Sequence, residues 1–306
     1  MRSNFSENLK LDDKQIKNLL EVFPKGVVAF DLEMTGLSAI VDKIIELAAI
    51  KVNADGSIET FHQLINPLIE IPEYTKPYHG LENEDLRDKP TLKKPLKDFI
   101  DFYNNLPLIA HNAQFDASFI IRGHHEYNYD FSLSDIYDSC RFIRTIYKKS
   151  KEKPENFKLD TLATYYDLNF EHHQALDDAL ICLHLFANGI KKLKSDIVEF
   201  EIKTPLKSLV KEKGYIFKLN SFKKPAEYEL PKKYRELIEF VQSKTVIQIM
   251  YQGGSLKNQF RPVKPIALLP MPNGLTLYAE CLNSKTHKHF KLKKIKDFTH
   301  EAKEDA

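Results

Sequence analysis

A short apolar run that ends in two carboxylates constrains this chain more than any other feature. Residues 26–30 are rich in β-branched and aromatic side chains, so we expect a buried strand over residues 26–31. Asp31 and Glu33 stand two positions apart, and side chains two apart on a strand project to the same face. Two carboxylates that converge on one point repel each other unless a hard divalent cation lies between them. The alternative is an exposed strand end whose acids are solvated.

Two later stretches place polar side chains where such a site needs them. His173 precedes Asp178 by five residues at the start of an amphipathic helical pattern, so the pair spreads over the helix start and the loop before it. Asp178 then suits a metal ligand, and His173 suits a base that takes a proton from water. Earlier in the chain, the apolar residues 108–110 lead through polar residues to Asp116, and such strand-to-helix junctions are common site positions in α/β sheets.

In this order, the three stretches resemble the three motifs of the DEDDh (DnaQ-like) 3′–5′ exonuclease family, whose α/β domain has an RNase H-like fold with a mixed sheet flanked by helices. The matching segments are Asp31-x-Glu33-x-Thr35-Gly36-Leu37, His111-Asn112-x-x-Phe115-Asp116, His173-x-Ala175-x-x-Asp178 and a smaller one, Tyr78-His79-Gly80-Leu81. The resemblance covers residues 25–190, after an N-terminal helical extension over residues 1–24. Three ordered motifs are far more specific than a lone Asp-x-Glu pair.

The resemblance implies hydrolysis of phosphodiester bonds with the help of two metal ions. The residues that it assigns to catalysis are Asp31, Glu33, Asp116, His173 and Asp178. The four acids would hold two divalent ions, Mg²⁺ or Mn²⁺, because these cations prefer oxygen ligands. The histidine would act as general base, since a neutral imidazole accepts a proton near pH 7. The product would be a nucleoside 5′-monophosphate.

The resemblance also implies contacts with the substrate. The residues concerned are Thr35, Leu37, His79, Asn112 and Phe115. Leu37 and Phe115 match positions that pack on the terminal bases, and apolar stacking suits an enzyme that must accept every base. Core packing is the alternative for Phe115, and a loop histidine with its own hydrogen bonds is the alternative for His79. His172 competes with His173 as the base, but only His173 has the family's spacing to Asp178.

The net charge of +2 hides a strong division along the chain. Residues 191–306 hold 24 Lys and Arg against 13 Asp and Glu, a balance of +11, which leaves −9 for residues 1–190. Part of the negative charge belongs to the expected metal site, and the basic second half suits a nucleic-acid backbone. The alternative is that these lysines only solvate a surface.

Other classes of protein are disfavoured by composition. No apolar run approaches the roughly 18 residues of a membrane span, and the polar N-terminus lacks a signal-peptide core, so we expect no membrane partner and a cytoplasmic address. Cys140, Cys182 and Cys281 are odd in number and far apart, which indicates buried thiols rather than a zinc site or a disulfide.

Periodicity and turn signals predict the order of elements in the first domain. Asn53-Ala54-Asp55-Gly56 is a hairpin signal between the second and third strands. The expected strands are residues 26–31, 43–52, 58–65, one at 108–110 and one around 137–140. The expected helices are residues 8–22, 92–104, one from Phe115, one around 159–163 and a closing helix after His173.

The tail has a different pattern. Residues 191–230 are Lys-rich and predict a linker or small helical element. Residues 231–306 predict one helix, 231–241, with Pro231 in its first turn, followed by short strands, two of which, 259–263 and 265–269, lie on either side of Lys264. We expect these strands to form a small β-barrel of the Sm or SH3-like kind. The tail resembles the WYL domain of bacterial regulators at Ile247–Tyr251, at Arg261-x-Val263-x-Pro265 and at Phe290-x-Leu292-x-x-Ile295. It departs from that family at the signature, where Leu275-Thr276-Leu277 replaces Trp-Tyr-Leu.

Three functional hypotheses follow. The leading one is a 3′–5′ exonuclease that acts on single-stranded DNA ends in replication or repair, with the basic tail holding the strand. In the second, the same site trims RNA or short oligonucleotides, because nothing in the sequence reads a 2′-hydroxyl. In the third, the protein is a proofreading or regulatory subunit that binds a DNA polymerase or other repair proteins. The full set of acids argues against a pure binding protein.

Overall fold

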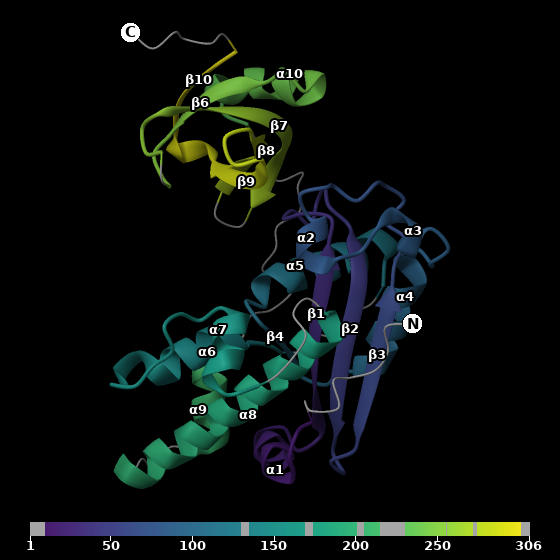
Figure 1. The fold of residues 1–306 in the computed structure, drawn as a ribbon, viewed down its shortest axis with the longest axis vertical. Coiled ribbons are helices and arrows are strands. Elements are labelled where there is room, and N and C mark those ends of the chain that lie inside the picture. The colour runs from purple at the N-terminus through teal and green to yellow at the C-terminus, as the bar shows by residue number, and fades with distance from the viewer. Residues whose placement is uncertain are drawn as a thin grey trace. The chain divides into compact units, whose positions relative to one another are not determined.

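A computed structural model describes residues 10–129, 135–168, 174–200, 205–214, 230–254, 256–271 and 274–300 (Figure 1). The chain divides into two compact units. The first comprises residues 1–35 and 43–219, and the second comprises residues 36–42 and 220–306. Within the described ranges, no helix is long and apolar enough to cross a membrane.

Among the described residues, five strands of the first unit form a mixed sheet in the order β3-β2-β1-β4-β5. The strands are β1 Gly26–Met34, β2 Ile44–Asn53, β3 Ile58–Leu64, β4 Leu108–Ala110 and β5 Ile136–Asp138. β1, β2 and β3 pair in antiparallel fashion, whereas β4 and β5 continue the sheet in parallel with β1. The expected hairpin between β2 and β3 is therefore present, and β1 lies at the centre.

Helices cover both faces of this sheet. Their bounds are α1 Asp13–Val22, α2 Lys76–His79, α3 Asn83–Leu86, α4 Lys93–Tyr103, α5 Gln114–Tyr127, α6 Ser139–Ile146, α7 Leu159–Tyr165, α8 Ala175–Phe200 and α9 Leu206–Lys213, with a 3₁₀ turn η1 at Tyr147–Lys149. α1 begins at a capping box, in which Asp12 accepts from the Gln15 backbone N–H (2.7 Å) and Gln15 accepts from that of Asp12 (3.0 Å). α4 packs through Phe99 on Phe30 of β1 and Phe61 of β3.

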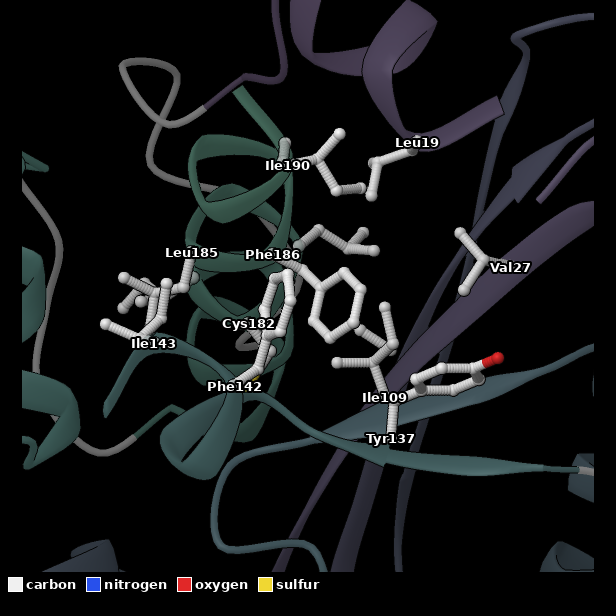
Figure 2. Close-up of a cluster of buried hydrophobic side chains, with 14 of the residues drawn as sticks. Leu19, Val27, Ile109, Tyr137, Phe142, Ile143, Cys182, Leu185, Phe186 and Ile190 are labelled. Atoms are coloured by element: carbon white, nitrogen blue, oxygen red, sulfur yellow. The ribbon is translucent and has the colours of Figure 1, made fainter. Parts of the chain in front are cut away.

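The largest core lies between α8 and the opposite face of the sheet (Figure 2). Val27 and Ala29 of β1 point into it, and both are fully buried. Phe186 of α8 stacks on Phe142 of α6 at 4.3 Å between ring centroids and meets Tyr137 of β5 edge to face at 5.7 Å. α8 is therefore fixed across the central strands over much of its length.

Gly26, at the start of β1, is a position where only glycine fits. Its φ is +105°, and a Cβ there would lie 2.6 Å from the carbonyl oxygen of Val52 on β2. We expect Gly26→Ala to lower the free energy of unfolding by about 1–3 kcal/mol, because the residue would be strained and would push β2 away. Gly56→Ala is the matched control: its φ of +86° is also strained, but its nearest neighbour is Ile16 at 3.4 Å. Denaturant unfolding should show the larger loss at Gly26, and equal losses would contradict the clash.

The second unit contains one helix and one antiparallel sheet among its described residues. The elements are a 3₁₀ turn η4 Lys232–Tyr234, α10 Glu236–Ser243, β6 Ile247–Tyr251, β7 Phe260–Met271, β8 Gly274–Cys281, β9 Thr286–Lys291, a 3₁₀ turn η5 Leu292–Lys294 and β10 Ile295–Thr299. The strand order is β10-β6-β7-β8-β9. Leu237 of α10 packs in the core with Ile249, Leu277 and Phe290 of the sheet.

The tail differs from the sequence prediction in two details. The helix expected over residues 231–241 is a 3₁₀ turn followed by the separate helix α10, so the proline precedes the turn rather than the helix. The two strands expected on either side of Lys264 are the single strand β7, whose pairing with β8 shifts register between Pro265 and Ala267. A bulge at this point lets one strand bend and continue past its prolines.

Candidate active site

The two carboxylates of β1 continue the buried row that faces α8. Val27, Ala29, Asp31 and Glu33 share one face because they alternate along the strand. The first two lie in the core beneath α8, and the row turns from apolar to acidic at Asp31. Both acids are half-buried, so the strand carries them to the edge of the core rather than into open solvent.

The third acid comes from the first turn of α8. Asp31, Glu33 and Asp178 each offer a carboxylate oxygen, and these three oxygens lie within 4.8 Å of one another. α8 packs on β1 and β2, which explains how residues almost 150 positions apart meet. A helix N-terminus also favours a negative charge, because its unpaired N–H groups carry partial positive charge.

Burial and mutual repulsion hold these acids toward their protonated forms. Loss of hydration raises the pKa of Glu33 to about 9 and that of Asp178 to about 7, with neighbouring acids adding to both shifts. The pKa of Asp31 is raised well above its ordinary value, first by burial and then by Asp116, Asp178 and Glu33. Carboxylates so placed are stabilised in their charged form by a cation.

Asp116 stands beside this group of three. It is 4% exposed and sits in the first turn of α5, directly after the parallel strand β4. Burial raises its pKa to about 8, and Asp138 at the end of β5 adds to the shift. The structure thus brings all four predicted acids to the same end of the sheet, three of them within ligand distance and Asp116 close enough to raise the pKa of Asp31 and Glu33.

Glu46 is a fifth acid of the site that was not predicted from the sequence. It lies directly opposite Glu33 in the β1/β2 pairing, is 7% exposed and raises the pKa of Asp31, Glu33 and Asp178. His62 on β3 contacts it, with Nε2 2.6 Å from Oε1. The sequence signal was present, since Glu46 is a single charge within the apolar segment 44–50.

The predicted substrate residues of the first motif are held by backbone contacts. Thr35 is fully buried, and its Oγ1 accepts from the Lys43 N–H at 2.9 Å. Leu37 belongs to segment 36–42, which groups with the second unit. Its side chain is 44% exposed, and its N–H donates to the Tyr278 hydroxyl at 3.1 Å. Tyr278 in turn donates to Asp42 at 2.7 Å.

The other predicted substrate residues differ in exposure. Asn112 is exposed and adopts φ +56° between β4 and α5, whereas Phe115 is partly buried and meets Phe119 edge to face at 5.6 Å. His79 is 2% exposed, and its Nδ1 accepts from the Leu81 N–H at 3.0 Å. His173, the predicted base, lies outside the described residues, as does its competitor His172.

The donor set fits divalent metal ions of the hard class. Every ligand that the cluster offers is a carboxylate oxygen, and burial together with neighbouring acids raises the pKa of Asp31 and Glu33. No ion pair between a Lys or Arg and Asp31, Glu33 or Asp178 occurs among the residues that the structure describes. A cation with oxygen ligands would remove the repulsion.

A mixed sheet with this strand order, and with acids gathered at one end of its central strand, defines an RNase H-like α/β enzyme. A family model described as "Exonuclease" matches residues 28–186, more than half of the chain, and the chain belongs to that family. The predicted class of enzyme, an exonuclease, is thereby confirmed. The match ends before residues 220–306, so the WYL resemblance gains no support from it.

Curated relatives carry the same domain within much longer chains. A DNA polymerase III PolC-type of Caldanaerobacter subterraneus subsp. tengcongensis is 33% identical over 168 residues, which are 55% of this chain and 12% of that protein. The PolC-type polymerase of Oceanobacillus iheyensis is 33% identical over 180 residues, 58% of this chain and 12% of the relative. This chain thus spans about an eighth of the relatives' length.

Among solved structures, E. coli Exonuclease I in complex with a 5cy-dT13 oligonucleotide has a similar fold. The TM-score is 0.51 at 15% sequence identity, over 84% of this chain and 55% of that one. A complex of the same enzyme with a dA16 oligonucleotide gives 0.50 at 15% identity, with the same coverage. At these identities the likeness concerns the fold alone.

Proposed function

We propose that this protein is a metal-dependent 3′–5′ exonuclease that removes nucleoside 5′-monophosphates from single-stranded DNA ends. The observation that carries the proposal is the meeting of Asp31, Glu33 and Asp178 within 4.8 Å, inside a domain of the exonuclease family. Five acids at one end of a sheet repel one another, which destabilises the fold. Bound divalent cations would remove this repulsion, and such cations also catalyse phosphodiester hydrolysis.

In this proposal, Asp31, Glu33 and Asp178 bind two divalent ions, Mg²⁺ or Mn²⁺, with Asp116 orienting the second. When bound, the ions supply a nucleophile at neutral pH and neutralise the charge that develops on the phosphate. His173, from the segment that leads into α8, takes the proton of the attacking water. Asn112, exposed on the turn after β4, contacts the sugar or phosphate, and Thr35, Leu37, His79 and Phe115 keep their predicted substrate contacts as part of the proposal.

A second candidate is a proofreading role beside a DNA polymerase. It is favoured by the PolC-type relatives, in which a domain like this one is part of a replicative polymerase by name. Such a role, like the first, places the protein in the cytoplasm with DNA. RNA trimming is the third candidate, because the site described above contains nothing that distinguishes the two sugars.

We also propose that the second unit is a small β-barrel of the WYL-like kind that holds nucleic acid. Its support is the antiparallel sheet, the bulged strand β7, and the basic balance of residues 220–306, which hold 16 Lys and Arg against 9 Asp and Glu. A role as ligand sensor is not part of the proposal, because the aromatic signature is replaced at residues 275–277.

The test is a nuclease assay on matched 5′-labelled single-stranded DNA and RNA with Mg²⁺ or Mn²⁺. We expect a metal-dependent ladder that shortens from the 3′ end. The ladder should fade in His173→Ala by about 10²–10⁴-fold, the usual contribution of a general base. The polymer that is shortened faster identifies the substrate class. Failure to shorten either polymer would contradict both the exonuclease and the proofreading proposals and would favour a regulatory subunit whose main work is binding.

A further inference from the structure

The segment from α6 to the start of α7 is the most basic part of the first unit. Residues 141–158, called here the basic segment, hold seven Lys and Arg and two Glu. Residues 1–190 as a whole have 21 Lys and Arg against 30 Asp and Glu. The basic segment thus holds a third of the Lys and Arg side chains of residues 1–190. The proposed catalytic mechanism gives these side chains no role.

The charges of the basic segment face solvent and are largely uncompensated. Lys148, Lys151 and Lys153 are exposed, and no described residue forms an ion pair with them. The lysines of α4 behave differently, since Lys94 and Lys97 pair with Asp98 and Asp101 one turn on. Lys148, Lys151 and Lys153 have no such partners among the described residues, whereas Arg141 at the start of the segment pairs with Asp138.

The basic segment is fastened to the end of the sheet where the acids lie. His111 follows β4, and its ring bridges two groups: Nδ1 is 2.9 Å from Ser139 Oγ, and Nε2 is 3.0 Å from the Phe157 carbonyl oxygen. The guanidinium of Arg144 lies over the Phe157 ring at 5.3 Å. His111 therefore ties the loop before α7 to the strand whose end leads to Asp116.

Helix packing holds both ends of the basic segment against α8. α6 and α7 both pack against α8, whose first turn carries Asp178 (Figure 1). Asp160, two residues after the basic segment, is close enough to raise the pKa of Asp178, second only to burial. The end of the basic segment near residue 158 therefore lies toward the acid cluster, whereas its start packs farther along α8, where Phe142 stacks on Phe186.

We propose that the basic segment binds the phosphate backbone of the single strand whose 3′ end lies at the acid cluster. Exposed lysines without acidic partners, anchored beside a site of opposite charge, fit a polyanion that must pass close to five acids. The inference rests on the proposed exonuclease function and locates part of its substrate grip in the first unit. It requires no contribution from the tail.

The test measures how salt weakens binding of a fluorescent dT oligonucleotide, with Ca²⁺ in place of Mg²⁺ to limit cleavage. Each lost phosphate contact on a single strand reduces the slope of log K against log salt by about 0.7. We expect the triple variant Lys148→Gln, Lys151→Gln, Lys153→Gln to lower the slope by about 2 and to weaken binding at least about tenfold at low salt. The matched control is Lys93→Gln, Lys94→Gln, Lys97→Gln on α4, which should leave the slope unchanged.

A small substrate separates this inference from the proposed function. Thymidine 5′-monophosphate p-nitrophenyl ester has no phosphate beyond the scissile one, so the triple variant should hydrolyse it as fast as the unmodified protein. An unchanged salt slope in the triple variant, or an equal fall in the α4 control, would overturn the inference while the exonuclease survives. If the unmodified protein cleaves neither the ester nor the polymer, the proposed function itself is rejected.

Discussion

Asp31→Asn is expected to reduce exonuclease activity by at least about 10²–10³-fold, the range for removing one preorganised charged group at a reaction centre. Asp31 lies in the middle of the cluster, where Asp116, Asp178, Glu33 and Glu46 all act on it. An amide there keeps the shape of the side chain but removes a charged ligand from the cation site. Titration calorimetry with Mn²⁺ should show weaker binding, which supplies a readout besides activity.

The control for this variant is Asp88→Asn. Asp88 is exposed and is not among the groups that raise the pKa of Asp31, so the activity and metal binding of this variant should match those of the unmodified protein. Asp31→Asn should also melt at the same temperature as the unmodified metal-free protein or higher, because one member of a repelling set is gone. If the variant instead melts at a lower temperature than the unmodified metal-free protein, the loss of activity would be explained by a damaged fold.

The metal-free protein is expected to lose stability as pH rises from 6 to 9. The pKa values of Asp178, Asp116 and Glu33 in the folded protein are about 7, 8 and 9, far above the roughly 4 of the unfolded chain. At pH values between the unfolded and the folded pKa values, the folded state binds more protons than the unfolded state. The free energy of unfolding therefore falls as the pH rises. The loss is complete only above the folded pKa values.

Thermal melts in the presence of a chelator should show this fall directly. A loss of 1 kcal/mol lowers Tm by roughly 2–4 °C in a domain of this size, and we expect more than about 5 °C between pH 6 and pH 9. Mg²⁺ or Mn²⁺ should restore Tm most strongly at pH 9, because it binds the charged carboxylates of the folded state. A Tm that is flat over this range, with and without metal, would contradict the raised pKa values.

Local signals sufficed for the elements that carry the site. The apolar run before Asp31 predicted β1, the Asp-Gly turn predicted the β2–β3 hairpin, and the helical pattern after Asp178 predicted α8. These signals are strong because period, turn chemistry and burial agree with one another. The meeting of Asp31 with Asp178, by contrast, was anticipated only through the resemblance to a family of known fold.

Features that depend on pairing between distant segments were missed. Glu46 enters the site because strand register sets it opposite Glu33, and a one-residue slip would turn it to the other face. β7 continues past Pro265 because a bulge relieves its pairing with β8 there, whereas its sequence predicts two short strands. Register and bulges are settled by tertiary packing, which single-residue preferences do not encode.

The docking of α8 across β1 has a consequence for the order of events during synthesis. Asp31 emerges from the ribosome early, and Asp178 follows almost 150 residues later, so the cluster is incomplete until most of the first unit has been translated. Contacts between segments so far apart in sequence also form slowly, because the chain loses loop-closure entropy before these contacts can stabilise it. Under the proposed function, we therefore expect a nascent or truncated chain that stops before α8 to lack nuclease activity, which would begin only when the first unit is whole.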